Sequence, residues 1–260
     1  MNLPTTTARM LLFCALLSFF NCNNKANKDH SIPNYIPRNS YFVDSYDDVK
    51  IYRDNSTKEP MDGYFIVGNK TTKWEEFHIK EGLLYGDYVF YHQNGEKFMH
   101  STYKNGKLHG EEITYFPSGK VKKESHYKNG ALNGKVISYF ENGQILSESV
   151  LKDNQPITSI TYNDTGDIES KMFVENGKNI TQSIKNGKVF KEQISSNYDN
   201  FEGVKFYNDD NTMKIYLQML DEGNDTYLVE LNEEGEEIKR INVATNPREI
   251  SKYREYISSL

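Results

Sequence analysis

The stretch that decides the fold is YKNGKLHG at Tyr103–Gly110, which returns as YKNGALNG at Tyr127–Gly134. A second landmark, a tyrosine followed four positions later by a glycine, recurs at the same step from Tyr91, Tyr115 and Tyr139. Each period carries two turn signals with about seven residues between them, a spacing too short for helices and typical of strands. The pattern predicts an all-β fold, an elongated antiparallel sheet built from β-hairpin repeats.

The turn after each second-landmark tyrosine sets the strand register. A three-residue loop that ends in a left-handed glycine would pair Tyr115 with Val121 and Tyr139 with Ile145. A two-residue Asn-Gly loop would instead pair Phe140 with Ile145 and move the tyrosine to the other face of the sheet. We favour the three-residue loop.

The repeat glycines fall into two sets with different expected roles. One set follows turn-forming residues and supplies positive φ: Gly95, Gly106, Gly119, Gly130 and Gly143. The other set is expected to open strands, where the missing side chain would let an aromatic ring lie against the backbone: Gly86, Gly110 and Gly134.

Because adjacent strands lie about 4.8 Å apart, equivalent residues form ladders along the sheet. An aromatic ladder would either pack the sheet or stack against a ligand such as a sugar ring: Tyr91, Tyr103, Tyr115, Tyr127, Tyr139, Phe116 and Phe140. A basic ladder would either bind an anionic polymer or lipid headgroup or keep the sheet edge soluble: Lys80, Lys104, Lys128 and Lys152. Glu81 and Asp153 adjoin two of these lysines, which favours the solubilising role.

The amino-terminal segment 1–22 predicts export. Arg9 precedes the apolar run 10–20, which has the length of a signal-peptide core and is too short to span a bilayer. The segment resembles a bacterial lipoprotein signal, and this resemblance implies acylation of Cys22 and an envelope protein anchored to the membrane. The alternative is that Cys22 is an incidental thiol. Residues 23–50 are interpreted as a tether or linker.

The repeat also carries a family resemblance. From about Gly82 to Asp153, the Y-K-N-G-x-L-x-G pattern followed by Y-[FY]-x2-G resembles the MORN-variant (MORN_2-like) repeats of the YwqK-type family, whose members are often labelled antitoxins. The resemblance implies a protein partner, with a toxin as one candidate. Weaker copies are expected at 63–82, 174–187 and 203–223, so that the repeat domain spans 51–245.

The carboxyl-terminal end of the chain predicts a short helix over 246–260 that caps the sheet. Asn246, Pro247 and Glu249 stand at the N-cap, first and third helical positions. Ile250, Tyr253, Ile257 and Leu260 lie on one stripe, which would pack against the sheet.

Composition and motifs argue against several classes of function. The net charge of −6 is unfavourable for nucleic-acid binding. The six histidines show no metal-ligand spacing, and no nucleophile elbow or phosphate-binding loop is present. We therefore expect no catalytic residues, metal or cofactor. The sequence predicts a non-enzymatic exported scaffold that binds a protein, or alternatively an envelope glycan or anionic lipid.

Overall fold

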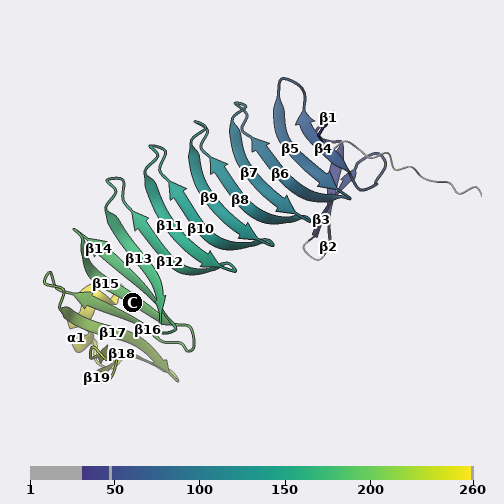
Figure 1. The fold of residues 1–260 in the computed structure, drawn as a ribbon. Helices are drawn as coiled ribbons and strands as arrows, with labels where there is room; N and C mark the ends of the chain where they lie inside the picture. The colour runs from purple at the N-terminus through teal and green to yellow at the C-terminus, as the bar shows by residue number, and fades with distance from the viewer. Residues whose placement is uncertain (1–30, 47–48, 259–260) are drawn as a thin grey trace, which may run out of the picture.

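The computed structural model describes residues 31–46 and 49–258, and it contains one long twisted sheet of 17 strands (Figure 1). From β4 to β19 each strand pairs antiparallel with the next along the chain, and β1 (Pro33–Ile36) lies parallel to β4 at one end. The first part of the array comprises β4 (Gly63–Gly68), β5 (Lys73–Lys80), β6 (Leu83–Tyr91), β7 (Lys97–Lys104), β8 (Lys107–Tyr115), β9 (Val121–Lys128), β10 (Ala131–Tyr139) and β11 (Ile145–Lys152). The second part comprises β12 (Gln155–Tyr162), β13 (Ile168–Glu175), β14 (Lys178–Lys185), β15 (Lys188–Ser196), β16 (Glu202–Tyr207), β17 (Met213–Glu222), β18 (Asp225–Leu231) and β19 (Glu237–Asn242). The predicted fold class is confirmed, and the weaker copies before and after the clear repeats continue the same sheet.

Two kinds of turn alternate between the long edges of the sheet. At one edge, two-residue turns such as Asn105-Gly106 have both residues at positive φ, 50° and 76°. At the other edge, three-residue loops pair Tyr115 with Val121 and Tyr139 with Ile145, as favoured from the sequence. The two-residue turns also stack on one another, because the amide of Gly106 donates to the carbonyl of Leu84 at 2.8 Å and this bond repeats in the next hairpin. Backbone hydrogen bonds therefore join successive hairpins beyond the strand ladders.

The expectation for the second set of glycines is wrong. Gly110 and Gly134 lie inside strands, next to breaks in the register, at φ of 110° and 124°. A side chain at Gly110 would meet Thr102, one at Gly134 would meet the Cβ and the first ring atom of His126, and one at Gly86 would enter open space. Glycine serves these positions because a β-bulge requires a backbone conformation that other residues rarely adopt.

A small separate sheet covers the start of the array. It consists of β2 (Tyr41–Tyr46) and β3 (Val49–Asp54), and its Tyr41 and Tyr52 rings lie 5.5 Å from the ring of Phe77. Phe77 is fully buried in the hydrophobic cluster at this end. The linker predicted up to residue 50 is therefore wrong over its described part, which forms β1 and β2, and β3 lies outside the repeat sheet. The sequence predicts only a linker that runs into a first edge strand there, because the contacts that stabilise these short strands are with residues distant in sequence.

The carboxyl-terminal helical segment covers the other end. It runs through α1 (Pro247–Ile250), a 3₁₀ turn η1 (Ser251–Tyr253) and α2 (Arg254–Ile257). Tyr253 packs into a buried cluster with Leu217, Leu228 and Ile241, so the expected cap is present. Asn246 stands at the N-cap with Pro247 and Glu249 in the first turn, as predicted, but the Asn246 amide donates to Asn242 and Thr245 and makes no cap hydrogen bond.

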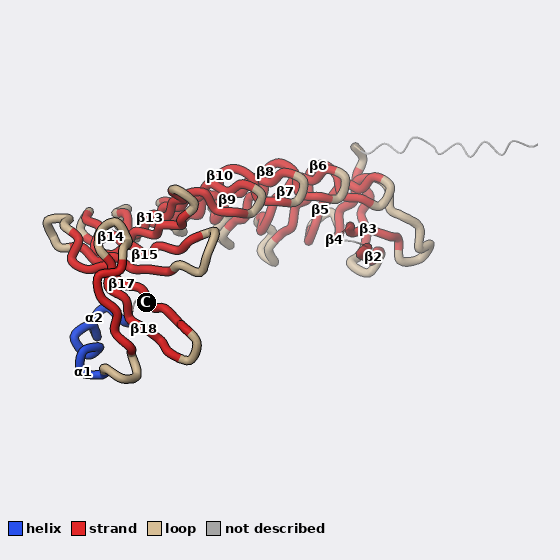
Figure 2. The backbone as a smooth tube through the Cα atoms, turned by 90° about the horizontal axis from the view of Figure 1, so that it is seen from below, coloured by secondary structure: helices blue, strands red, loops and turns tan. Residues whose placement is uncertain are grey.

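The hairpin β2–β3 and the helical segment lie on the same side of the sheet (Figure 2). We call this side, which carries Phe77 and Leu217, the capped face, and the opposite side, which carries Glu76 and Tyr216, the open face. Between residues 90 and 193, all of which the structure describes, only Ser101 and Ser125 are buried. The middle of the array is therefore a single layer whose apolar side chains all remain partly accessible.

Tyrosine–carboxylate pairs link neighbouring strands on the open face. Each tyrosine follows its glutamate on the next strand along the chain, and the pairs are Tyr91–Glu76, Tyr139–Glu124, Tyr162–Glu148 and Tyr207–Glu192. In the first pair the phenol of Tyr91 on β6 donates at 2.9 Å to Glu76 on β5. These bonds hold adjacent strands together through their side chains as well as their backbones.

We predict that Phe77→Ala lowers the free energy of unfolding by about 3–5 kcal/mol, because it removes a fully buried ring beneath β2–β3. The same change at Phe98, which is 42% exposed, should cost less than about 1 kcal/mol. Urea unfolding of the two variants measures the difference. Equal losses would contradict the position of this core.

We predict that Glu76 contributes an acid-sensitive part of the stability. Burial acts to raise the pKa of Glu76, but hydrogen bonds from Tyr64, Lys73 and Tyr91 outweigh it and hold the pKa below its ordinary value. Since the folded-state pKa is depressed, the contribution is present above the unfolded-state pKa of about 4.3 and is lost as pH falls through the folded-state value.

Urea unfolding between pH 7 and pH 3 tests this. Glu76→Gln should lower stability at pH 7 and reduce the loss between pH 7 and pH 3, whereas Glu169→Gln at an exposed position should change neither. An unaltered acid profile in the Glu76 variant would be evidence against the assignment.

Candidate functional site

The structure divides the aromatic ladder between the two faces. Tyr91, Tyr115 and Tyr139 lie on the open face, next to the carboxylates described above. Tyr103 and Tyr127 lie on the capped face, where Tyr103 packs against the core of Phe77 and Tyr127 donates to Glu112 at 3.4 Å. The ladder predicted from the sequence is therefore two rows that no single flat ligand can contact together.

Tyr115 differs from its equivalents on the open face. On the strand before it, the position that corresponds to Glu76 holds His100, and the His100 ring pairs with Asp87 at 3.0 Å. No residue in the described part of the chain forms a side-chain hydrogen bond with the Tyr115 hydroxyl. Burial, and secondarily the charge of Glu124, raises the pKa of Tyr115, so its phenol stays protonated at neutral pH. A half-buried ring with a free hydroxyl thus stands near the centre of the exposed repeats.

The phenylalanines of the ladder lie in the loops at one long edge. Phe116 and Phe140 are half-buried, and the Lys122 ammonium lies 5.7 Å from the centre of the Phe116 ring. Each directly follows an open-face tyrosine in the sequence, Tyr115 or Tyr139.

The basic ladder forms an exposed row along the opposite long edge. Lys80, Lys104, Lys128 and Lys152 are all exposed, and none forms an ion pair with a residue in the described ranges. Two of them meet a predicted tyrosine and glycine, because Lys80, Lys104, Tyr103 and Gly86 share a hollow of about 510 Å³. This hollow brings four of the predicted site residues together.

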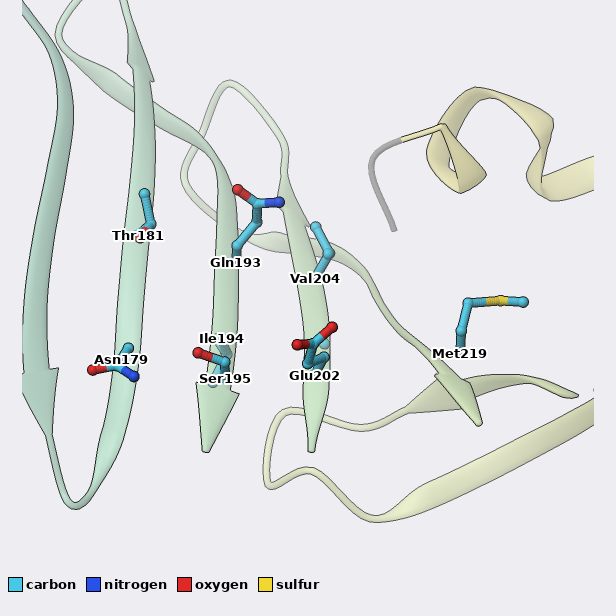
Figure 3. Close-up of a pocket in the computed structure, with 9 residues that line it drawn as sticks. Asn179, Thr181, Gln193, Ile194, Ser195, Glu202, Val204 and Met219 are labelled. Atoms are coloured by element: carbon cyan, nitrogen blue, oxygen red, sulfur yellow. The ribbon is translucent and has the colours of Figure 1, made fainter. Parts of the chain in front are cut away.

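A further hollow lies on the capped face near the helical segment (Figure 3). It has a volume of about 260 Å³ and is lined by Asn179, Thr181, Gln193, Ile194, Ser195, Glu202, Gly203, Val204 and Met219. Polar side chains from three neighbouring strands, β14 to β16, line it together with apolar Val204 on β16 and Met219 on β17. Sequence analysis missed these residues because they lie where the repeat has lost its aromatic landmarks; the available signal was the replacement of aromatics by amides and hydroxyls.

On the open face, a groove of about 620 Å³ crosses β13 to β17. Its aromatic side chains are partly covered by the chain's own cations, with Lys178 5.3 Å from the Phe201 ring and Lys205 4.8 Å from the Tyr216 ring. Two of the aromatic rings in this groove therefore already have a cation of the chain itself as a partner.

Two findings bear on other expectations. Among the described residues no three His, Cys, Asp or Glu side chains gather as metal ligands, and no described helix has the length and hydropathy to cross a membrane. The predicted signal and Cys22 lie outside the described residues.

With this geometry in place, comparison with known proteins identifies the repeat. The family described as MORN repeat variant matches residues 108–129 and 132–153. Each match begins with a strand after a two-residue turn and ends in the next such turn, so it contains β8 with β9 and β10 with β11. No curated protein matches the chain. The repeats at 108–153 are thus similar to MORN repeat variants, and the surrounding sheet continues their architecture.

Proposed function

We propose that this chain is a non-enzymatic, exported binding protein whose exposed repeats dock a protein partner. The observation that carries the proposal is the lack of any buried apolar side chain between residues 90 and 193. Apolar and aromatic side chains that remain accessible in a regular row are a common basis of protein recognition. The match to MORN repeat variants over 108–153 is consistent with this role.

The open face offers the better docking surface. Ile113 and Tyr115 on one strand and Ile137 and Tyr139 two strands further on repeat the same half-buried pair. The free Tyr115 hydroxyl adds a polar group that a partner can bond, and tyrosines of this kind are frequent energetic centres of interfaces. Side chains here present a preorganised surface, because strands on both sides fix them.

A more specific version of the proposal names the cellular location of the protein and the identity of its partner. The amino-terminal sequence supports export and attachment through Cys22, and the YwqK-type resemblance supports an antitoxin-like role with a toxin as partner. An exported antitoxin would require a toxin that acts outside the cytoplasm. A gene for such a toxin next to the gene for this chain would support this form.

We predict that the double variant Tyr115→Ala, Tyr139→Ala weakens capture of the protein partner from the envelope fraction at least tenfold, because it removes two anchors of the open face. Tyr127→Ala on the capped face is the matched control and should leave capture unchanged. Quantitative mass spectrometry of cross-linked complexes measures both, with circular dichroism to verify folding. Undiminished capture of the protein by the double variant would refute docking at this face. So would a double variant that still captures the protein but no longer captures a glycan.

The basic row supports a second candidate, binding of an anionic lipid headgroup. Its four exposed lysines, which form no ion pair within the described ranges, recur along one edge, so several could contact a charged surface together. This attraction would be screened by salt, unlike docking on the open face.

We predict that, if this candidate holds, the full chain binds vesicles containing phosphatidylglycerol at 50 mM salt and is released at 500 mM. Lys104→Gln with Lys128→Gln should weaken binding several-fold, whereas the same change at Lys185 and Lys188, outside this row, should have a smaller effect. Sedimentation with neutral phosphatidylcholine vesicles is the reference. If the fraction of the chain bound to vesicles changes neither with salt nor with the lysine substitutions, this candidate is eliminated.

A further inference from the structure

The capped-face hollow of Figure 3 lies beside a second one, with which it shares the lining residue Asn179. The second hollow, of about 490 Å³, is lined by Gln155, Pro156, Met172, Val174, Asn179 and Asn197. Asn179 borders both hollows, and its amide donates to Asn197 at 2.7 Å. The lining residues of the two hollows extend from β12 to β17, and we call the two hollows together the capped-face channel.

The polar side chains of the first hollow are free to bond a ligand. Thr181, Gln193, Ser195 and Glu202 make no side-chain hydrogen bond with any residue in the described ranges, although all four line the same small volume (Figure 3). Gln182, the next residue after Thr181, points to the open face and donates to Glu192 at 2.7 Å. On these strands, the polar side chains without a hydrogen-bond partner therefore lie on the capped face.

The chemistry of the lining restricts the ligand. Among the described residues, Glu202 is the only ionisable one lining either hollow, so the channel has no cation to attract an anionic ligand and too little negative charge to select a cationic one. The strands beneath it are fully paired with their neighbours, so no free strand edge is offered to a peptide backbone. Recognition must come from amide and hydroxyl side chains, which both donate and accept hydrogen bonds.

We propose that the capped-face channel binds a neutral oligosaccharide. Sugar hydroxyls also donate and accept, and they match the amides of Asn179 and Gln193 and the hydroxyls of Thr181 and Ser195. The apolar C–H face of a sugar ring would lie on Val204 and Met219 in the first hollow and on Met172 and Val174 in the second. Because the two hollows are neighbours that share Asn179, a chain of linked rings could occupy both, one part in each. This site is separate from the open-face docking surface and does not depend on it.

The experiment measures binding of neutral hexasaccharides to the full chain by isothermal titration calorimetry. The probes are the β-1,4-linked hexamers of glucose, mannose and N-acetylglucosamine and the α-1,4-linked hexamer of glucose. At least one should bind, and Thr181→Val and Gln193→Met, which keep side-chain volume but remove polar groups, should each weaken it about tenfold. Thr161→Val is the matched control, because Thr161 lies on the same face outside the channel, and it should stay within twofold of the unmodified chain.

Each other outcome overturns the proposal. Absence of binding to all four hexamers, or binding that survives both channel variants, would remove it. Loss of binding in the Tyr115→Ala, Tyr139→Ala variant with the channel variants unaffected would move glycan recognition to the open face. Competition by an uncharged peptide that is itself sensitive to Thr181→Val would assign the channel to a peptide. Thermal unfolding of every variant verifies that the fold is intact, and failure of open-face docking would leave these results unchanged.

Discussion

A sheet without a second layer has to stabilise itself within its own plane, and the rest of this structure follows from that constraint. Backbone pairing joins each strand to the next, and the stacked two-residue turns add a bond between hairpins. On the open face, tyrosine–carboxylate pairs add a further link between neighbouring strands. No single hairpin buries enough apolar surface to be stable alone, so stability comes from the interfaces between neighbours.

One column of the repeat shows how the constraint selects residues. Phe77, Ser101 and Ser125 stand at equivalent positions on the capped face, each one repeat further along the chain. Phe77 is buried because β2–β3 covers it, whereas no described element lies over the other two. There a serine sits close to the sheet, and Glu112 covers it while accepting a hydrogen bond from Ser101 at 3.0 Å. In this column the large apolar residue stands where another element shields it from water, and serine stands at the other two positions.

This explains which features could be predicted from the sequence. Period, strand register and terminal cap depend on local turn chemistry and on side-chain alternation, both visible within a window of one repeat. The structured segment before residue 51 depends on Tyr41 and Tyr52 reaching Phe77, a contact with no local signature. The bulges at Gly110 and Gly134 were not predicted, since a glycine alone does not distinguish a missing side chain from a left-handed backbone. The site residues were predicted as ladders, but alternation along the strands placed their tyrosines on two faces.

The same reasoning explains why a channel arises where the repeat is least regular. In the clear repeats, side chains at equivalent positions bond one another or cover the sheet, so few polar groups remain for a ligand. In β14 to β16 the capped face no longer carries the side chains of the clear repeats. Thr181 and Gln193 lie side by side there without a hydrogen-bond partner among the described side chains. The opposite sides of these strands keep the regular arrangement, with Tyr207 and Gln182 both bonded to Glu192. Strand pairing alone preserves the sheet at this point, which leaves the capped-face side chains free to specialise without loss of the fold.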